Sequence, residues 1–101
     1  MACMNPLKGK WLFSGPFRDA TVEFSTDGDQ LKGSTTIEFD GKATDFKVVL
    51  GGLLQNGISV RFSARPADIE FEYYADCVGE DLFEGNCSGD FVGPAKLQHI
   101  K

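Results

Sequence analysis

The segment Ile58-Ser59-Val60-Arg61-Phe62-Ser63-Ala64-Arg65 alternates strictly between an apolar and a polar side chain. Successive side chains of a β-strand point to opposite faces of a sheet, so this period of two predicts a strand with one buried and one solvated face. An amphipathic helix would need apolar residues three and four positions apart, and this segment has no such spacing. The segment therefore indicates a β-protein.

The same alternation returns in four other parts of the chain. Residues 31–39 and 69–77 keep it throughout, and two shorter runs cover residues 20–24 and 46–50. No window of eleven or more residues carries the apolar stripe of an amphipathic helix. We therefore predict an all-β chain with almost no helix.

Turn-forming residues separate these segments. Asp27-Gly28, Asp40-Gly41 and Asn56-Gly57 each supply the positive φ angles that tight antiparallel hairpins need. Further breaks rich in Gly, Pro and Asp fall at Gly15-Pro16, Arg65–Asp68, Val78–Asp81 and Ser88–Asp90. These connections divide the chain into about eight strands, and each is too short for a parallel crossover.

A meander of eight strands closes most economically into a barrel, because an open sheet would expose its apolar face and leave two unpaired edges. We predict a single domain over residues 1–101, built as an eight-stranded antiparallel up-and-down barrel, with an open or irregularly closed small barrel as the alternative. The predicted interior consists of Trp11, Phe13, Val22, Phe24, Leu31, Ile37, Phe39, Phe46, Val48, Leu50, Ile58, Val60, Phe62, Ile69, Phe71, Tyr73, Phe83 and Leu97.

The interior of an eight-stranded barrel is just wide enough to be filled by side chains or to hold one small ligand. The nine Phe residues of the chain favour a mostly filled interior. Gly33 and Gly85 fall on the inner face, where they either leave space beside the rings or relieve strand curvature.

The opening of the first strand, Gly9-Lys10-Trp11, resembles the Gly-x-Trp signature of the calycins, the small barrels that include lipocalins and avidins. Leu31-Lys32-Gly33-Ser34 is similar to a later strand of avidin-like chains. The resemblance implies a lipocalin-like barrel that binds a ligand and assembles through exposed strand faces, so a homodimer is one expectation. It does not extend to biotin, because Phe13 and Phe17 follow Trp11 where biotin-binding avidins carry polar side chains.

Composition excludes several classes of function. Ten Lys and Arg residues against fifteen Asp and Glu residues give a net charge of −5, which argues against a nucleic-acid-binding protein. No stretch is long and apolar enough to predict a transmembrane helix. Motifs of phosphate loops, dinucleotide folds, zinc sites and α/β hydrolases are absent, and His99 is the one histidine. We expect no cofactor and no metal site.

Three cysteines, Cys3, Cys77 and Cys87, form no Cys-x-x-Cys pair and no even framework. This favours reduced thiols and a cytoplasmic location. The alternative is a secreted protein whose signal peptide has been removed. If Cys77 lies opposite Phe83 in the hairpin that follows it, then Cys87 lies opposite Tyr73. The two cysteines are then four residues out of register, roughly 13 Å apart and too far for a disulfide. We expect three free thiols.

Acidic residues gather in the C-terminal third, where the residues after Arg65 carry a net charge of −6 against +1 for the rest. Like charges opposed across strands are destabilising, so an acidic strand face is a candidate site for a basic protein partner. The candidate partner-binding residues are Glu70, Glu72, Asp76 and Glu84. The alternative is a solvated face on which Arg61 and Arg65 of the preceding strand pair with these acids.

Three functions fit these features, the first being a non-enzymatic module that holds a small apolar ligand at the barrel mouth. Its candidate ligand-binding residues are Trp11, Phe13, Phe39, Phe62, Tyr73 and Phe83. The first alternative is a protein-interaction or protease-inhibitor barrel that acts through its outer face and loops. The second is a cofactor-free isomerase or cyclase that uses Tyr73, Cys87 or His99. A large cavity inside the barrel would favour the first function, and a filled barrel would favour the first alternative.

Overall fold

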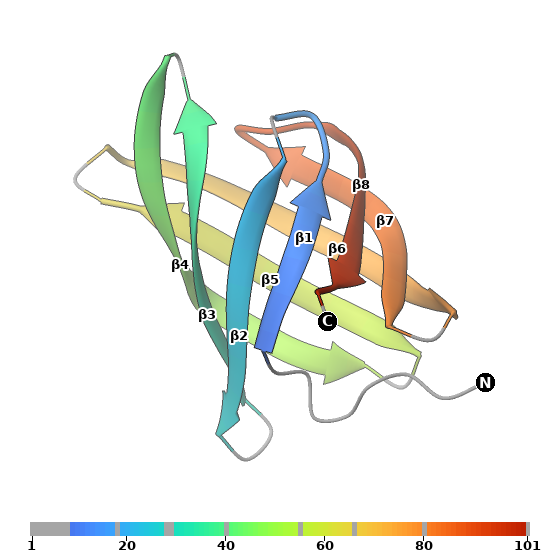
Figure 1. Cartoon of the computed structure of the whole chain (residues 1–101). Helices are drawn as coiled ribbons and strands as arrows, with labels where there is room; N and C mark the ends of the chain where they lie inside the picture. Colours follow the sequence, from blue (N-terminus) through green and yellow to red (C-terminus); the bar gives the residue numbers. More distant parts are fainter. Residues whose placement is uncertain are drawn as a thin grey trace.

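In the computed structural model, eight antiparallel strands form one closed barrel in chain order, and the last strand pairs back to the first (Figure 1). The structure describes residues 9–17, 19–27, 30–39, 41–54, 56–65, 67–79 and 81–100, and these contain no helix. The strands are β1 (Gly9–Ser14), β2 (Ala20–Asp27), β3 (Gln30–Phe39), β4 (Lys42–Leu54), β5 (Gly57–Ala64), β6 (Ile69–Gly79), β7 (Leu82–Gly89) and β8 (Gly93–His99). The predicted all-β, up-and-down antiparallel barrel is confirmed.

Buried side chains from all eight strands meet inside the barrel. Along β2 burial alternates residue by residue from Ala20 to Ser25, which is the pleat of a strand with one dry face. The largest side chains with less than 2% exposure are Trp11, Tyr73, Phe13, Phe46, Phe62 and Phe71. Removing each such side chain from water contributes about 1.5–3 kcal/mol before the entropy of ordering it is counted, so this aromatic core dominates the stability of the barrel.

The prediction that Leu50 points into the barrel is wrong, because β4 contains a β-bulge. Val48 lies opposite Phe62, and Leu50, two residues later in β4, lies opposite Arg61, which is only one residue away from Phe62 in β5. One extra residue therefore reverses which face of β4 points inward. Leu50 is 66% exposed as a result.

The remaining differences from the predicted interior are small. Val48 and Ile69 are partly buried and pack against the core rather than within it. The side chain of Phe39 lies outside the part of the chain that the structure describes.

Turn residues occupy the predicted connections. A turn at Asn56 joins β4 to β5, and Gly41 has a φ of +80° before β4. Asp68 and Asp81 take φ values of 58° and 59° just before β6 and β7, a conformation that Asp tolerates better than most residues. Two other residues of the predicted hairpin pairs, Gly28 and Asp40, lie outside the described residues.

Strands β6 and β7 pair in the predicted register, with Cys77 opposite Phe83, Tyr73 opposite Cys87 and Asp76 opposite Glu84. Cys87 is free and buried, so the prediction that it is not bonded to Cys77 is confirmed. The prediction of three free thiols is wrong, because Cys77 is disulfide-bonded. The register argument excluded only Cys87 as a partner. Cys3, the remaining cysteine of the chain, lies outside the described residues.

Strand β7 curves strongly around the barrel, and Gly85 lies in its middle (Figure 1). A Cβ at Gly85 would overlap the carbonyl oxygen of Tyr74 and lie 2.5 Å from the Cα of Ala75. Gly85 thus permits a close approach of β7 to β6 and leaves no open space there, which decides between its two predicted roles. Its cross-strand neighbours, Ala75 and Ala95, are also small.

We predict that unfolding the protein without reductant exposes one titratable thiol per chain, that of Cys87. In the native state this thiol should not react, because it is 3% exposed and burial raises its pKa to about 12. Thiol titration with and without denaturant measures both values, and prior reduction should raise the unfolded count to three. The variant Cys87→Ala should show none before reduction. Three thiols in the unreduced, unfolded protein would contradict the disulfide at Cys77.

We predict that Gly85→Ala lowers the free energy of unfolding by about 1–3 kcal/mol, because the added methyl group has no room against the backbone of β6. Gly79→Ala is the matched control, since a Cβ at Gly79 meets nothing within 4 Å, and it should change stability by less than about 0.5 kcal/mol. Urea unfolding of both variants gives the comparison. Equal stabilities would show that β7 has no steric need for glycine at this position.

Candidate functional site

The predicted ligand-binding residues lie inside the barrel, packed against one another. Trp11, Phe13, Phe62, Tyr73 and Phe83 are each at most 2% exposed. The ring of Phe13 lies 4.8 Å from that of Tyr73 and 5.8 Å from that of Phe62, and Trp11 lies 5.7 Å from Phe83. The sixth residue, Phe39, has its side chain outside the described part. The five described rings serve as core.

Two of the three residues proposed for an isomerase or cyclase, Tyr73 and Cys87, are buried inside the barrel. The Tyr73 hydroxyl donates a hydrogen bond of 3.0 Å to the carbonyl of Ala95, and burial raises the pKa of Tyr73 far above its usual value. Burial likewise holds the Cys87 thiol in its protonated form. His99 packs its ring 4.9 Å from that of Trp11. Tyr73 and Cys87 therefore carry neither a base nor a thiolate at neutral pH.

The predicted acidic face divides into two parts. Glu72 accepts hydrogen bonds from the guanidinium of Arg61, and Glu70 lies 4.0 Å from that of Arg65. For these two acids the structure bears out the alternative of a solvated face paired with arginines. Such exposed pairs stabilise a protein by about 0–1 kcal/mol.

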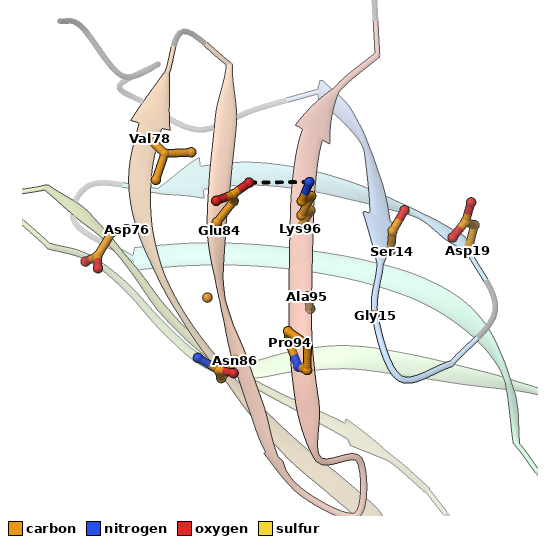
Figure 2. Close-up of a pocket in the computed structure, with 11 residues that line it drawn as sticks. Ser14, Gly15, Asp19, Asp76, Val78, Glu84, Asn86, Pro94, Ala95 and Lys96 are labelled. Atoms are coloured by element: carbon orange, nitrogen blue, oxygen red, sulfur yellow. Dashed lines mark ion pairs between the residues drawn. The ribbon is translucent and has the colours of Figure 1, made fainter.

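The other two acids, Asp76 and Glu84, line a groove of about 640 Å³ on the outside of the barrel. Figure 2 shows its lining drawn from β6, β7, β8 and the end of β1, with Glu84 and Lys96 joined across neighbouring strands by an ion pair of 3.4 Å. The lining residues are Ser14, Gly15, Asp19, Asp76, Val78, Glu84, Gly85, Asn86, Pro94, Ala95 and Lys96. Its volume falls in the usual range of ligand sites, about 300–1,000 Å³.

The groove combines uncommitted polar groups with apolar walls. Among the described residues, neither Asp19 nor Asp76 makes an ion pair or a side-chain hydrogen bond. Val78 is 44% exposed on β6, the strand of Asp76, and Pro94 is exposed on β8. Gly85 and Ala95 lie between these groups and present no side chain beyond a methyl. The groove can therefore take up a chain that offers hydrogen-bond donors and some apolar surface.

A second groove of about 620 Å³ on the outside of β2, β3 and β4 provides a contrast. Here part of the polar lining already has partners in the protein. Thr36 donates a hydrogen bond of 2.7 Å to Asp45, and Thr35 donates one of 2.9 Å to the carbonyl of Thr21. Volume does not distinguish the two grooves, and Asp19 lines both. The β6–β8 groove differs in having Asp76 on the same strand as the exposed side chain of Val78.

Sequence reasoning identified two groove residues and missed most of the others. Asn86 and Pro94 could have been found from the same alternation. Asn86 lies two residues after Glu84 on the outer face of β7, and Pro94 is its pairing partner on β8. Asp19 could not be found in this way, because it belongs to the connection between β1 and β2 and has no strand register.

The described residues contain no group of three or more His, Cys, Asp or Glu side chains that could hold a metal ion. They also contain no helix of the length and apolarity needed to cross a membrane. Comparisons with protein-family models, curated proteins and solved structures find no match to this chain. The resemblance to calycins stays a prediction.

Proposed function

We propose that the protein is a non-enzymatic interaction module that binds a basic segment of a partner protein in the groove over β6, β7 and β8. The observation that supports this most is the uncommitted carboxylate of Asp76 on the same strand as the exposed apolar side chain of Val78, with a second uncommitted carboxylate, Asp19, at the opposite side of the groove (Figure 2). This role corresponds to the alternative in which the barrel acts through its outer face.

Packing inside the barrel favours the outer face over the barrel mouth. A small apolar ligand among Phe13, Phe62 and Tyr73 would have to displace rings that already contact one another. Displacing them would open voids elsewhere, because interiors are packed at nearly constant density. Binding in the outer groove requires no such rearrangement.

Charge and shape of the groove both suit lysine or arginine side chains. Its lining carries three acids and one base, and Lys96 is already paired with Glu84. Long basic side chains bury their methylene stems along apolar surface and keep the charged head near acceptors. Val78 offers such surface on the strand of Asp76, and Pro94 offers it on β8. The net charge of −5 further favours encounter with a basic partner.

The disulfide at Cys77 also affects the proposed location. Disulfides persist in oxidising compartments and are rare in the cytosol. The cytoplasmic prediction rested on reduced thiols, so it loses its premise. We propose that the protein works in an oxidising compartment.

We predict that the peptide Ac-Gly-Arg-Gly-NH2 shifts the backbone amide signals of Gly85, Asn86 and Lys96 in ¹⁵N-labelled protein. The arginine head should reach Asp76, so Asp76→Asn should weaken binding by up to about fivefold, the upper value for an exposed ion pair. Added salt should weaken it further. A two-dimensional NMR titration measures the affinity and maps the site.

Two controls keep this test specific. Glu23→Gln removes a carboxylate from the groove over β2 to β4 and should leave the affinity unchanged. The peptide Ac-Gly-Glu-Gly-NH2 should produce no shifts. Equal response to both peptides, or shifts spread over the whole surface, would contradict the proposed function.

A further inference from the structure

A row of outward side chains crosses neighbouring strands along the groove over β6, β7 and β8. Asp76 on β6 lies opposite Glu84 on β7, and Glu84 lies opposite Lys96 on β8. Lys96 in turn lies opposite Ser14, the last residue of β1. All of these residues line the groove (Figure 2). The row therefore runs across the strands and not along them.

Asp19 stands at the next position of this row. The register of β1 and β2 pairs Phe13 with Ala20. Ser14 follows Phe13 and Asp19 precedes Ala20, so Ser14 and Asp19 are the next residues of the two chains in that register. Adjacent strands lie about 4.8 Å apart, and four such spacings put Asp19 roughly 19 Å from Asp76 along the row. The two carboxylates thus stand at opposite ends of the lining (Figure 2).

The charges of this row are paired in its middle and free at its ends. In the middle, the Glu84 carboxylate lies 3.4 Å from the Lys96 ammonium group, so each already has a counter-ion. At the ends, neither Asp76 nor Asp19 has such a partner among the described residues. Beyond Asp76 the row meets Gly57 of β5, which brings no cation to it. A ligand that matches this pattern carries positive charge at two separated points and no net charge between them.

The closed barrel decides how a partner segment lies in the groove. Each described strand pairs with a neighbour on both sides, since β8 pairs back to β1, so the segment cannot add to the sheet as a further strand. Gly85 and Ala95 lie opposite each other and line the groove with no side chain larger than a methyl group. This leaves room for a backbone that crosses the strands.

The length of the row sets the spacing of the matching charges. An extended segment advances about 3.3 Å per residue, so a step of six positions covers about 20 Å. Side chains of an extended segment alternate between two faces, and an even step puts both basic side chains on the same face.

We infer that the partner of this groove is an extended protein segment with two basic side chains about six positions apart and uncharged residues between them. One basic side chain reaches Asp76 and the other reaches Asp19, while the backbone of the segment crosses β7 and β8. The inference rests on the proposed function and adds to it the spacing of the recognised charges. Joining both cations in one chain makes the second contact intramolecular, so the matching spacing raises the affinity.

Two peptides of identical composition test this spacing by NMR titration of the ¹⁵N-labelled, disulfide-intact chain. In Ac-Arg-Gly-Gly-Gly-Gly-Gly-Arg-NH2 the arginines stand six positions apart, and in Ac-Gly-Gly-Arg-Arg-Gly-Gly-Gly-NH2 they are adjacent. Adjacent residues are separated by only about 3.8 Å of backbone, so the second peptide engages one end of the row at a time. The spaced peptide should bind about three- to fivefold more tightly, which is what one further exposed ion pair contributes at most.

Asp19→Asn and Asp76→Asn should each remove this advantage, because either change leaves one end of the row without a charge. Glu23→Gln is the matched control. Glu23 is an exposed carboxylate of the groove over β2 to β4, which Asp19 also lines, and its loss should leave the advantage intact.

Equal affinity of the two peptides, with Ac-Gly-Arg-Gly-NH2 still bound at the groove, would overturn the inference and leave the proposed function in place. An advantage that survives Asp19→Asn, or that disappears in Glu23→Gln, would overturn the inference as well. Absence of binding by all three peptides would overturn both.

Discussion

Aromatic packing inside the barrel is the constraint on which the rest of the structure depends. The ring centroid of Phe13 lies 4.8 Å from that of Tyr73, 5.8 Å from that of Phe62 and 6.3 Å from that of Phe71. Eight strands enclose only enough space for side chains or for one small ligand. In this barrel the buried aromatic side chains occupy that space. The groove over β6, β7 and β8 lies outside this packing, on the outer surface of the barrel.

Tyr73 connects the interior to the groove. Its ring belongs to the aromatic core, while its hydroxyl donates to the carbonyl of Ala95, which lines the groove on the other side of the wall. Because burial raises the pKa of Tyr73, the hydroxyl stays protonated and remains a donor throughout the physiological range. The position of β8 under the groove is thereby set by the core.

Much of this architecture could be predicted from local patterns. The alternation that begins at Ile58 and the turn residues between strands were enough for an up-and-down barrel. The same parity placed Asp76 opposite Glu84, which are two members of the groove. Strand pairing has a strict period of two, so one correct register decides the facing of many residues at once.

The bulge in β4 could not be predicted in this way. The stretch from Val48 to Leu54 has apolar side chains at both parities, so local hydrophobicity does not determine which face points inward. One additional residue there moved Leu50 to the surface. Asp19 was missed for a different reason, because a connection has no register. The disulfide at Cys77 was missed because parity tests a proposed pair and says nothing of the other cysteine.

The filled interior is the central claim, and xenon binding tests it most directly. Xenon enters apolar cavities that are large enough to hold it, and methyl groups that line such a cavity change their chemical shift as it fills. The methyl groups of Ile37, Ile58 and Leu97 are at most 1% exposed and report on the interior. Under xenon pressure their ¹³C methyl signals should show only small, linear changes. A saturable shift of these methyl groups would reveal an internal cavity and return the barrel mouth to the leading place as binding site.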